Sequence, residues 1–356
     1  MSTHIDSITV QKVTTSRLPE VDFNNLTFGS TFTDHMFMCD FKNGTWQDAK
    51  IIPYGPLTIS PAAKVFHYGQ AVFEGMKAYK DEQGEIFLFR PDENLSRINK
   101  SSKRMAIPEF PEALFFEALH KLLELDKDWV QSGIGNSLYI RPFAMATQVG
   151  VSASPSNEYK FMILCAPVNA YYTGDVSVEI AQKYSRSADG GVGAAKAAGN
   201  YGAQFYPTNL ARERGFQQVI WTDSNEHKYL EEAGTMNVFF RINDTLITAP
   251  TSDRILDGET RKSVLALAEK AGIATEVRKL TVAELVVAAK AGELKEMFGS
   301  GTAAVISPIS AFDYDGTTYD IEKQSDSYAH RFKQELMNIQ HNRADDPFGW
   351  RYAISS

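Results

Sequence analysis

The chain of 356 residues is long enough for about two domains of the usual size, roughly 150 residues each. Hydrophobic residues make up 43% and charged residues 22% of the sequence, and 22 Phe, 15 Tyr and 4 Trp exclude intrinsic disorder over most of its length. The net charge of -8 argues against the overall basic field that nucleic acid or anionic lipid favours, so neither is expected as a partner.

Hydrophobic periodicity divides the first half of the chain into strands and two helices that open at prolines. The first 50 residues lack a regular period and predict an arm and loops around one or two strands. The elements predicted after them, in chain order, are two strands within 71–90 joined at DEQGE, a helix from Pro91 that breaks by Pro108, a helix at 111–129, and strands at 137–145 and 159–167.

Residues 168–175 carry turn-forming residues without a period and predict an interdomain linker. This linker separates a smaller N-terminal domain, 1–167, from a larger C-terminal domain, 176–356. The elements predicted after the linker are short strands in VSVEIAQKY, FQQVIWTD, MNVFFRIN and TLITAP, and helices at about 259–271, 281–291 and 322–341. Strands and helices mix without a strict βαβ rhythm, which favours two α+β domains over a doubly wound sheet.

Cys39 and Cys165 form no CxxC pair, which disfavours a disulfide scaffold and a thiolate zinc site. We therefore expect no metal centre and a reducing, cytoplasmic location. The polar N-terminus lacks the apolar region of a signal peptide, and no stretch approaches the roughly 18 apolar residues of a membrane span.

Lys196 stands in a run of small residues, GGVGAAKAAG (190–199), in which only Val192 and Lys196 are larger than alanine. Glycine and alanine let the backbone approach a bound group closely, so a lone lysine here can be desolvated and meet a flat ligand. A flexible surface loop with a solvated lysine is the alternative interpretation.

Two phosphate-loop motifs do not match this sequence. A Walker A loop needs Gly before and Ser or Thr after the lysine, whereas Ala195 and Ala197 flank Lys196. A Rossmann fingerprint fails because Lys196 stands where its third glycine belongs. GSGTAA at 299–304 matches G-x-G-x-x-A, but Pro308 leaves no room for the long helix that a dinucleotide site needs.

A buried lysine amine forms a Schiff base with a carbonyl group, and pyridoxal phosphate is the commonest such aldehyde. The ring nitrogen of this cofactor needs a carboxylate, and its phenolic oxygen needs a hydrogen-bond donor. Its phosphate group needs N–H groups of the protein backbone, hydroxyls and an arginine. The groups that match these needs are Glu232, Tyr201, Glu259 and Thr260 at a helix start, Thr302 and Arg97. Taken singly each has a structural explanation, such as capping for Thr260, so only the combination indicates the cofactor.

Seven segments resemble the branched-chain amino acid aminotransferases, which are pyridoxal-phosphate enzymes of fold type IV. They are HYGQAVFEGMKAY (67–79), FRPDENLSRI (89–98), LYIRPF (138–143), GGVGAAKAAGNY (190–201), EEAGTMNVFF (231–240), LDGETRKSV (256–264) and FGSGTAAVISPI (298–309). The lysine block and EEAGTMN are specific, whereas the phosphate turns are weak alone. The resemblance implies a two-domain α+β fold, similar to D-amino acid aminotransferase, with the cofactor at the domain interface and the lysine in the C-terminal domain.

The resemblance also assigns roles, with Lys196 as the catalytic lysine that binds the cofactor and moves the α-proton. The implied cofactor contacts are Tyr201 to the phenolic oxygen, Glu232 rather than Glu231 to the ring nitrogen, and Arg97, the backbone of Glu259, Thr260 and Thr302 to the phosphate. The implied substrate contacts are Thr235 and the backbone of Thr302 and Ala303 to the α-carboxylate, with Tyr68, Phe73 and Tyr139 lining the pocket and Arg141 near its side-chain end. Without the resemblance, these aromatic residues would be interpreted as packed core.

The activity that the resemblance implies is ping-pong transamination of L-leucine, L-isoleucine and L-valine with 2-oxoglutarate, giving branched 2-oxo acids and L-glutamate, in a homodimer. A D-amino acid aminotransferase, a pyridoxal-phosphate lyase and a non-catalytic cofactor-binding protein remain as alternatives. The CxxC pair that some animal members carry after GTA is absent here, because residues 304–307 are AVIS.

Overall fold

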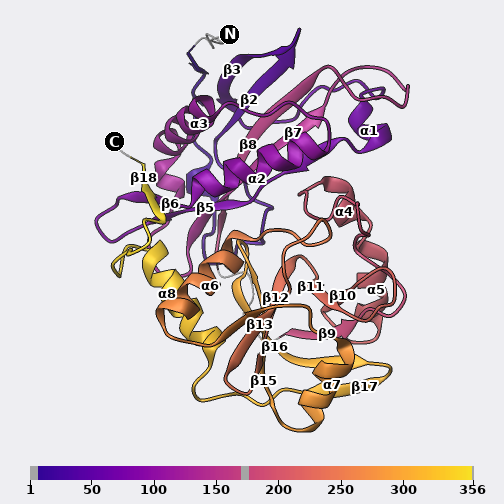
Figure 1. The fold of residues 1–356 in the computed structure, drawn as a ribbon. Coiled ribbons are helices and arrows are strands. Elements are labelled where there is room, and N and C mark those ends of the chain that lie inside the picture. Colours follow the sequence, from indigo (N-terminus) through magenta and orange to yellow (C-terminus); the bar gives the residue numbers. More distant parts are fainter. Residues whose placement is uncertain (1–6, 170–175, 355–356) are drawn as a thin grey trace. The chain divides into compact units, whose positions relative to one another are not determined.

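The structure of the protein, a computed structural model, describes residues 7–169 and 176–354 (Figure 1). These residues form two units, each built on a nine-stranded sheet. As far as they are described, Met1–Tyr171, Ala195–Ala198 and Met337–Ser356 make up unit 1, and Tyr172–Ala194 and Gly199–Leu336 make up unit 2. Within the described ranges, no helix is long and apolar enough to span a bilayer.

The sheet of unit 1 has the strand order β1-β3-β2-β8-β7-β5-β6-β18, and β4 pairs with β7. All of its pairs are antiparallel except the parallel pair β1–β3. Its strands are β1 (Thr9–Val10), β2 (His35–Lys42), β3 (Thr45–Pro53), β4 (Ala71–Phe73), β5 (Met76–Lys80), β6 (Ile86–Phe89), β7 (Ser137–Ala146), β8 (Tyr159–Val168) and β18 (Arg351–Ala353). The helices of unit 1 are η1 (Leu18–Glu20), α1 (Lys64–Tyr68), α2 (Pro91–Arg104), α3 (Glu112–Leu125) and η2 (Lys127–Trp129).

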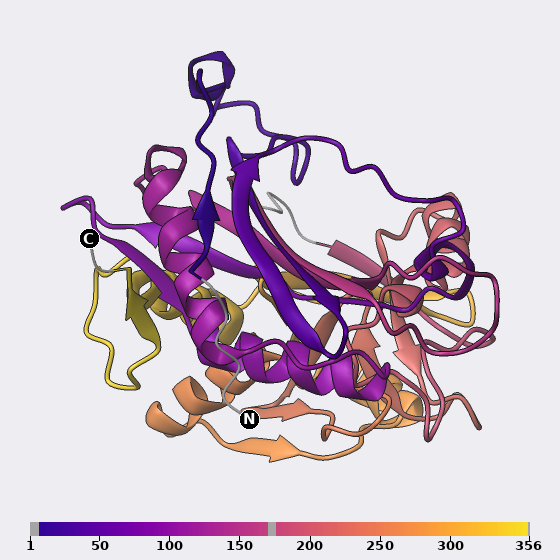
Figure 2. The same cartoon turned by 90° about the horizontal axis from the view of Figure 1, so that it is seen from above.

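Both faces of the unit 1 sheet are apolar. On one face lie α2 and α3, whose buried leucines share a core with the sheet (Figures 1 and 2). Successive residues of a strand point to opposite faces, so Phe37 and Cys39 join this core while Met36 and Met38 join a smaller cluster on the other face. The predicted helix starts at Pro91 and Pro111 are confirmed to within one residue.

Six strands of unit 2 close into a ring. The sheet order is β11-β10-β9-β16-β15-β12-β13-β14, and the additional pairing of β11 with β12 completes the ring. The strands are β9 (Val176–Ile180), β10 (Gln218–Thr222), β11 (Leu230–Ala233), β12 (Met236–Ile242), β13 (Thr245–Thr248), β14 (Thr275–Val277), β15 (Leu294–Gly301), β16 (Val305–Tyr314) and β17 (Thr317–Asp320). The helices are α4 (Ala198–Gly202), α5 (Phe205–Glu213), α6 (Glu259–Lys270), α7 (Val282–Lys290) and α8 (Tyr328–Gln340), of which α4 and α8 are shared with unit 1.

The predicted α+β class is confirmed, but the domain boundaries differ from those expected. Residues Ala195–Ala198, with the lysine, belong to unit 1 and not to the C-terminal unit, because Ala197 forms a β-bridge with Val72. Residues Met337–Ser356 also belong to unit 1, where β18 pairs with β6, and unit 1 is consequently the larger one. Of the predicted linker 168–175, Val168 ends β8 and residues 170–175 lie outside the described residues.

Candidate active site

The main chain of Lys196 is held on both sides within unit 1. Its N–H donates to Ser101 Oγ of α2 at 2.9 Å, and its carbonyl oxygen accepts from the Phe73 N–H of β4 at 3.1 Å. Its Nζ lies 4.7 Å from the centroid of the Phe73 ring. The short neighbours Ala195 and Ala197 are buried, which lets this segment lie against β4 and α2. The alternative of a flexible surface loop is therefore wrong for Lys196.

The Lys196 segment is part of a cluster in unit 1, and a second part of this cluster is formed by Phe73, Tyr139 and Arg141. Tyr139 and Arg141 point to the same side of β7, and Arg141 Nη2 donates to the Tyr139 hydroxyl at 2.7 Å. The guanidinium also lies 4.7 Å from the Phe73 ring centroid, while its buried Nε has no hydrogen-bond partner among the described residues. A Cβ at Gly75 would lie 2.2 Å from the Tyr139 hydroxyl, so glycine at this position makes room for the tyrosine.

Arg97 joins this cluster from α2, where its guanidinium is almost completely buried. It forms a two-bond ion pair with Glu74, a fully buried residue directly after β4. Tyr68, in contrast, lies on α1 with 44% of its surface exposed, and its hydroxyl donates to the Val151 carbonyl. Among the site residues predicted in unit 1, the structure thus groups five and leaves Tyr68 apart.

Glu232 of β11 is held in unit 2 as a buried carboxylate. Its Oε1 accepts from Asn237 Nδ2 at 3.1 Å and from the Leu256 N–H at 3.2 Å. Its Oε2 lies 2.8 Å from Arg186 Nη1, in a pair whose side chains are only 4% and 5% exposed. A carboxylate with these partners suits the protonated nitrogen of a bound pyridine ring.

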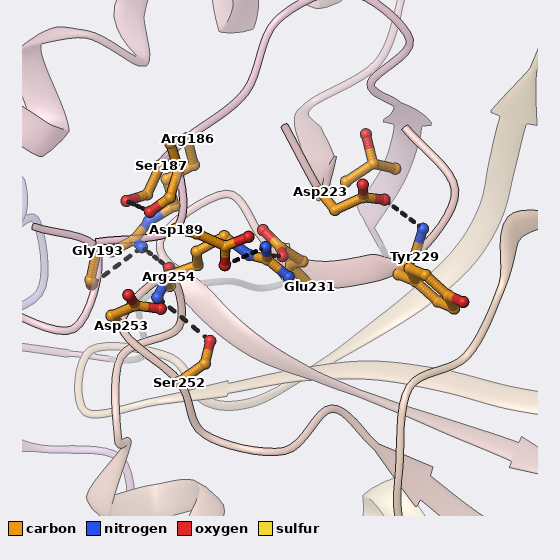
Figure 3. A network of polar contacts seen from close by, with 12 residues as sticks. Arg186, Ser187, Asp189, Gly193, Asp223, Tyr229, Glu231, Ser252, Asp253 and Arg254 are labelled. Atoms are coloured by element: carbon orange, nitrogen blue, oxygen red, sulfur yellow. Dashed lines mark hydrogen bonds and ion pairs between the residues drawn. The ribbon is translucent and has the colours of Figure 1, made fainter. Parts of the chain in front are cut away.

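Glu231, the neighbouring glutamate, has a different partner. Its Oε1 accepts from Arg254 Nε at 2.6 Å, and Arg254 Nη1 donates to Asp189 at 2.5 Å. Figure 3 shows Arg254 between these carboxylates, with Arg186 beside it. Burial raises the pKa of Glu231, and the charge of Arg254 offsets this only in part. Both glutamates are thus buried and paired with an arginine, and the assignment of the ring-nitrogen role to Glu232 rather than Glu231 stays a prediction.

Arg186, the partner of Glu232, also supports the segment that leads to Lys196. Arg186 Nη1 donates to the carbonyl oxygens of Gly193 and Arg254 (Figure 3). The Ala194 N–H donates to the Asp253 carbonyl. A Cβ at Gly193 would lie 2.3 Å from the Arg254 carbonyl oxygen. The small residue at 193 is thus required by close packing against the backbone of residue 254.

The start of α6 fits a phosphate. Its N-cap is Gly258, which has no side-chain oxygen for the first N–H groups of the helix, at Glu259 and Thr260. A Cβ at Gly258 would lie 1.9 Å from Asn237 Oδ1, so a larger residue would displace the Asn237 side chain that binds Glu232. The N–H groups of a helix start, the positive end of the helix dipole and the Thr260 hydroxyl are the donors that a phosphate needs.

The remaining predicted residues lie in unit 2. Thr302 and Ala303 are half-buried in the turn between β15 and β16. Thr235 is exposed in the turn between β11 and β12, directly after Gly234, whose φ of 57° favours glycine. Tyr201 is half-buried in α4. The location of the cofactor between the two units stays a prediction.

The sequence reasoning missed three charged residues of these clusters: Glu74, Arg186 and Arg254. Glu74 lies in FEGMKAY, one of the quoted segments, and Arg186 and Arg254 each lie within ten residues of one. Closeness to these motifs in the sequence was therefore a usable signal for the three residues. The sequence does not indicate, however, which buried side chains they pair with.

The chain is similar to known aminotransferases over nearly its whole length. The family described as "Amino-transferase class IV" matches residues 71–312. "Branched-chain-amino-acid aminotransferase 2" of Bacillus subtilis (strain 168) is 41% identical over 97% of this chain and 96% of that protein. "Branched-chain-amino-acid transaminase 1" of the same strain is 43% identical over 94% of this chain and 95% of that protein.

A solved structure agrees with these relatives. The branched-chain amino acid aminotransferase from Escherichia coli has a TM-score of 0.73 and 25% identity, and the match covers 91% of this chain and 99% of that one. The fold, the sequence motifs and the similarity to these relatives over nearly the full length indicate the same family. The chain belongs to the class IV aminotransferases and, within them, to the branched-chain amino acid aminotransferase family.

Proposed function

We propose that the protein uses pyridoxal 5'-phosphate to transaminate L-leucine, L-isoleucine and L-valine with 2-oxoglutarate, giving branched 2-oxo acids and L-glutamate. The observation that carries the proposal is the way Lys196 is held, with its peptide bound to β4 and α2 and its amine beside Phe73. A lysine fixed at its backbone, with a long flexible side chain, suits a residue that must bind a cofactor and also move a proton.

When bound, pyridoxal phosphate supplies an aldehyde that takes up the amino group and a ring that withdraws electrons from the substrate's α-carbon. Lys196 Nζ would accept the proton from the substrate's α-carbon in one half-reaction and return a proton to that carbon in the opposite one. Glu232, oriented by Asn237, the Leu256 N–H and Arg186, would hold a proton on the ring nitrogen. Tyr201 would donate to the phenolic oxygen.

Four groups would hold the phosphate: Arg97, the Glu259 N–H, Thr260 and Thr302. The two at the start of α6 act through a helix terminus, and the arginine supplies a full charge. Thr235, with the backbone of Thr302 and Ala303, would hold the substrate's α-carboxylate. These groups would bind the reactants in one orientation and so leave the α-proton within reach of Lys196.

The pocket must take an apolar side chain in one half-reaction and a carboxylate in the other. Phe73 and Tyr139, with Tyr68 as a further proposed lining residue, would supply the apolar surface. Arg141 is half-buried beside both rings, and its buried Nε has no hydrogen-bond partner in the part of the chain that the structure describes, so it could meet the glutamate carboxylate. A carboxylate buried without such a donor would cost several kcal/mol.

We also propose that the enzyme is a cytoplasmic homodimer. Phe66, Tyr68, Val149 and Val151 are between 44% and 66% exposed on α1 and the loop beside it, which the Gly150 N–H ties to the Ala62 carbonyl. An exposed apolar patch of this kind suits a protein interface. Cys39 and Cys165 are buried and unpaired, as a reducing compartment permits. Light scattering should give a mass of twice 39.6 kDa, and a mass of 39.6 kDa would contradict the dimer.

The activity is tested with purified protein, added cofactor and two donor amino acids. L-Leucine with 2-oxoglutarate should give L-glutamate, whereas D-alanine should give no product. Lys196→Ala should retain its fold, measured by circular dichroism, and lose the reaction. Turnover of D-alanine in preference to L-leucine would favour the alternative aminotransferase, and activity in Lys196→Ala would remove the proposed role of the lysine.

A further inference from the structure

Glu74 is a buried carboxylate in unit 1 that none of the roles above uses. It follows β4 directly, it is 0% exposed, and its N–H donates to the Pro142 carbonyl at 2.7 Å. A carboxylate taken out of water is costly unless it is paired and hydrogen-bonded. The partners of Glu74 therefore indicate why the charge is there.

The first partner is Arg97. Glu74 Oε1 accepts from Arg97 Nε at 2.6 Å, and Oε2 accepts from Arg97 Nη2 at 2.8 Å, a two-bond pair that fixes the plane of the guanidinium. Asn94 Nδ2, one helical turn earlier on α2, donates to Oε2 at 2.9 Å, and the Gly75 N–H donates at 3.0 Å. Glu74 thus joins the end of β4 to the buried face of α2.

The segment of Lys196 is bound to the same two elements, β4 and α2, through residues close to Glu74 and Arg97. Its carbonyl is bound by the Phe73 N–H, one residue before Glu74, and its N–H by Ser101 Oγ. Ser101 Oγ in turn donates to the Arg97 carbonyl at 2.9 Å. The lysine peptide is therefore held between the same two elements that Glu74 joins.

The electrostatics agree with this geometry. Burial raises the pKa of Glu74, but the charge and hydrogen bonds of Arg97, the positive charge of Lys196 and the hydrogen bond from Asn94 hold it below its usual value. Glu74 is accordingly ionised at neutral pH. One buried negative charge serves two neighbouring cations.

We propose that Glu74 is a positioning residue that fixes the Arg97 guanidinium for the cofactor's phosphate and supplies the counter-charge for the ammonium form of Lys196. The part that concerns Arg97 rests on the proposed function, since Arg97 is assigned to the phosphate there. The part that concerns Lys196 does not need the cofactor. The two parts are tested separately.

Three variants separate charge from structure. Glu74→Gln keeps the shape and removes the charge, and Glu74→Asp keeps the charge on a shorter side chain. Glu296→Gln is the matched control, because Glu296 in unit 2 is also a buried carboxylate paired with an arginine, Arg241 Nη1, at 3.0 Å. Urea unfolding of all three gives the stability that each substitution costs, so that an effect on the site can be separated from a general loss of stability.

The first experiment labels Lys196 in the cofactor-free protein. Trinitrobenzenesulfonate reacts with a neutral amine, and peptide mass spectrometry gives the initial rate at Lys196. Because an opposite charge nearby favours the ammonium, Glu74→Gln should raise this rate about threefold or more at neutral pH. Glu74→Asp and Glu296→Gln should stay near the wild-type rate. An unchanged rate in Glu74→Gln would overturn the counter-charge role, whether or not the protein is an aminotransferase.

The second experiment compares binding of pyridoxal phosphate and of pyridoxal, which lacks the phosphate, by absorbance titration. Since Glu74 orients Arg97, Glu74→Gln should reduce the preference for the phosphorylated form by about tenfold, the effect of one charge-assisted hydrogen bond. Glu74→Asp should recover part of it, and Glu296→Gln should leave it unchanged. An unchanged preference in Glu74→Gln would overturn the Arg97 role. A wild-type protein that binds neither compound would instead contradict the proposed function.

Discussion

Glu232 is a carboxylate whose two oxygens have different partners. Two hydrogen bonds reach Oε1, and Arg186 lies beside Oε2, so the side chain is fixed in one orientation. Glu232→Gln should leave the cofactor bound, but the ring nitrogen should then be protonated less often. The kcat with L-leucine should therefore fall by about 10²-fold or more. Steady-state kinetics with the absorption spectrum of the bound cofactor checks this.

The neighbouring glutamate is the control for that substitution. Glu231 is equally buried but pairs with Arg254 through Nε, so Glu231→Gln should lose far less kcat than Glu232→Gln. If Glu231→Gln is the slower variant, the ring-nitrogen role belongs to Glu231.

Arg141 is the residue on which dual specificity depends in this account. Its guanidinium lies beside Phe73 and Tyr139, where a glutamate carboxylate would need a donor and a leucine side chain would not. Arg141→Met should raise KM for L-glutamate and 2-oxoglutarate by about tenfold or more, and KM for L-leucine much less, because a lost charge-assisted bond costs about 1.5–3 kcal/mol. The two half-reactions, measured separately by cofactor absorbance, decide it. Equal losses in both would assign Arg141 to structure.

The sequence motifs drew attention to individual residues but not to the side chains with which those residues pair. Lys196 stands in a segment of unusual composition, and Glu232 stands in a motif that is specific through the family resemblance. Hydrogen bonds hold the Lys196 main chain and the Glu232 carboxylate in the structure. Glu74 escaped notice because its significance comes from Arg97, 23 positions away on another element. Arg254 is likewise 23 positions from Glu231. No local period reports such pairs, since they form only when strands and helices pack.

At the scale of elements, the small-residue segment before Lys196 is fixed by close packing. A Cβ at Gly193 would meet the carbonyl oxygen, C and Cα of Arg254 at 2.3–2.7 Å, and these backbone atoms cannot move aside cheaply. Gly193→Ala should therefore destabilise the protein by about 1–3 kcal/mol, as overpacking does, and weaken cofactor binding. Urea unfolding and absorbance titration measure the two effects.

Gly202, on α4, is the matched control for that substitution. A Cβ there would meet no packed atom of the described residues within 4 Å, and alanine favours a helix, so Gly202→Ala should leave stability unchanged or raise it by up to about 1 kcal/mol. If Gly193→Ala were as stable as Gly202→Ala, close packing would not explain the glycine at 193.

The elements that the sequence predicted are those with a strong period. The strands at 137–145 and 159–167 correspond to β7 and β8, and the helix at 259–271 corresponds to α6. The sequence analysis missed β16, which contains Pro308 within its pairing with β15. It also missed α5, where Pro207 stands in the first turn and is tolerated because the N–H groups there have no partner within the helix. Proline argues against a strand within a sheet, and for Pro308 the pairing of β16 with β15 overrides that signal.

At the scale of the whole molecule, the return of the C-terminus to unit 1 was not predictable from local signals. The pairing of β18 with β6 and the burial of His341 depend on residues that lie far earlier in the chain. His341 packs edge-on against Tyr79, with ring centroids 5.0 Å apart. This contact makes the stability of unit 1 depend on the protonation of one C-terminal residue.

That dependence has a definite sign. Burial, with the positive charges of Arg343 and Lys77, lowers the pKa of His341 from 6.5 to about 4. The unfolded chain thus binds the proton more readily than the folded one, so this contribution is complete above pH 6.5 and is lost as the pH falls toward about 4. His341→Gln should reduce the slope of unfolding free energy against pH in this window, measured by urea titration. Identical slopes in both proteins would contradict the burial of a neutral His341.

The claim that Lys196, Glu232 and the start of α6 serve one cofactor in branched-chain transamination has a direct test in the absorption spectrum. Purified protein should be yellow with pyridoxal phosphate bound, and the visible band should bleach when L-leucine is added and return with 2-oxoglutarate. Borohydride reduction before the leucine should abolish the response and place the label on Lys196. A colourless protein, a band that L-leucine leaves unchanged, or a label on another lysine would contradict the account.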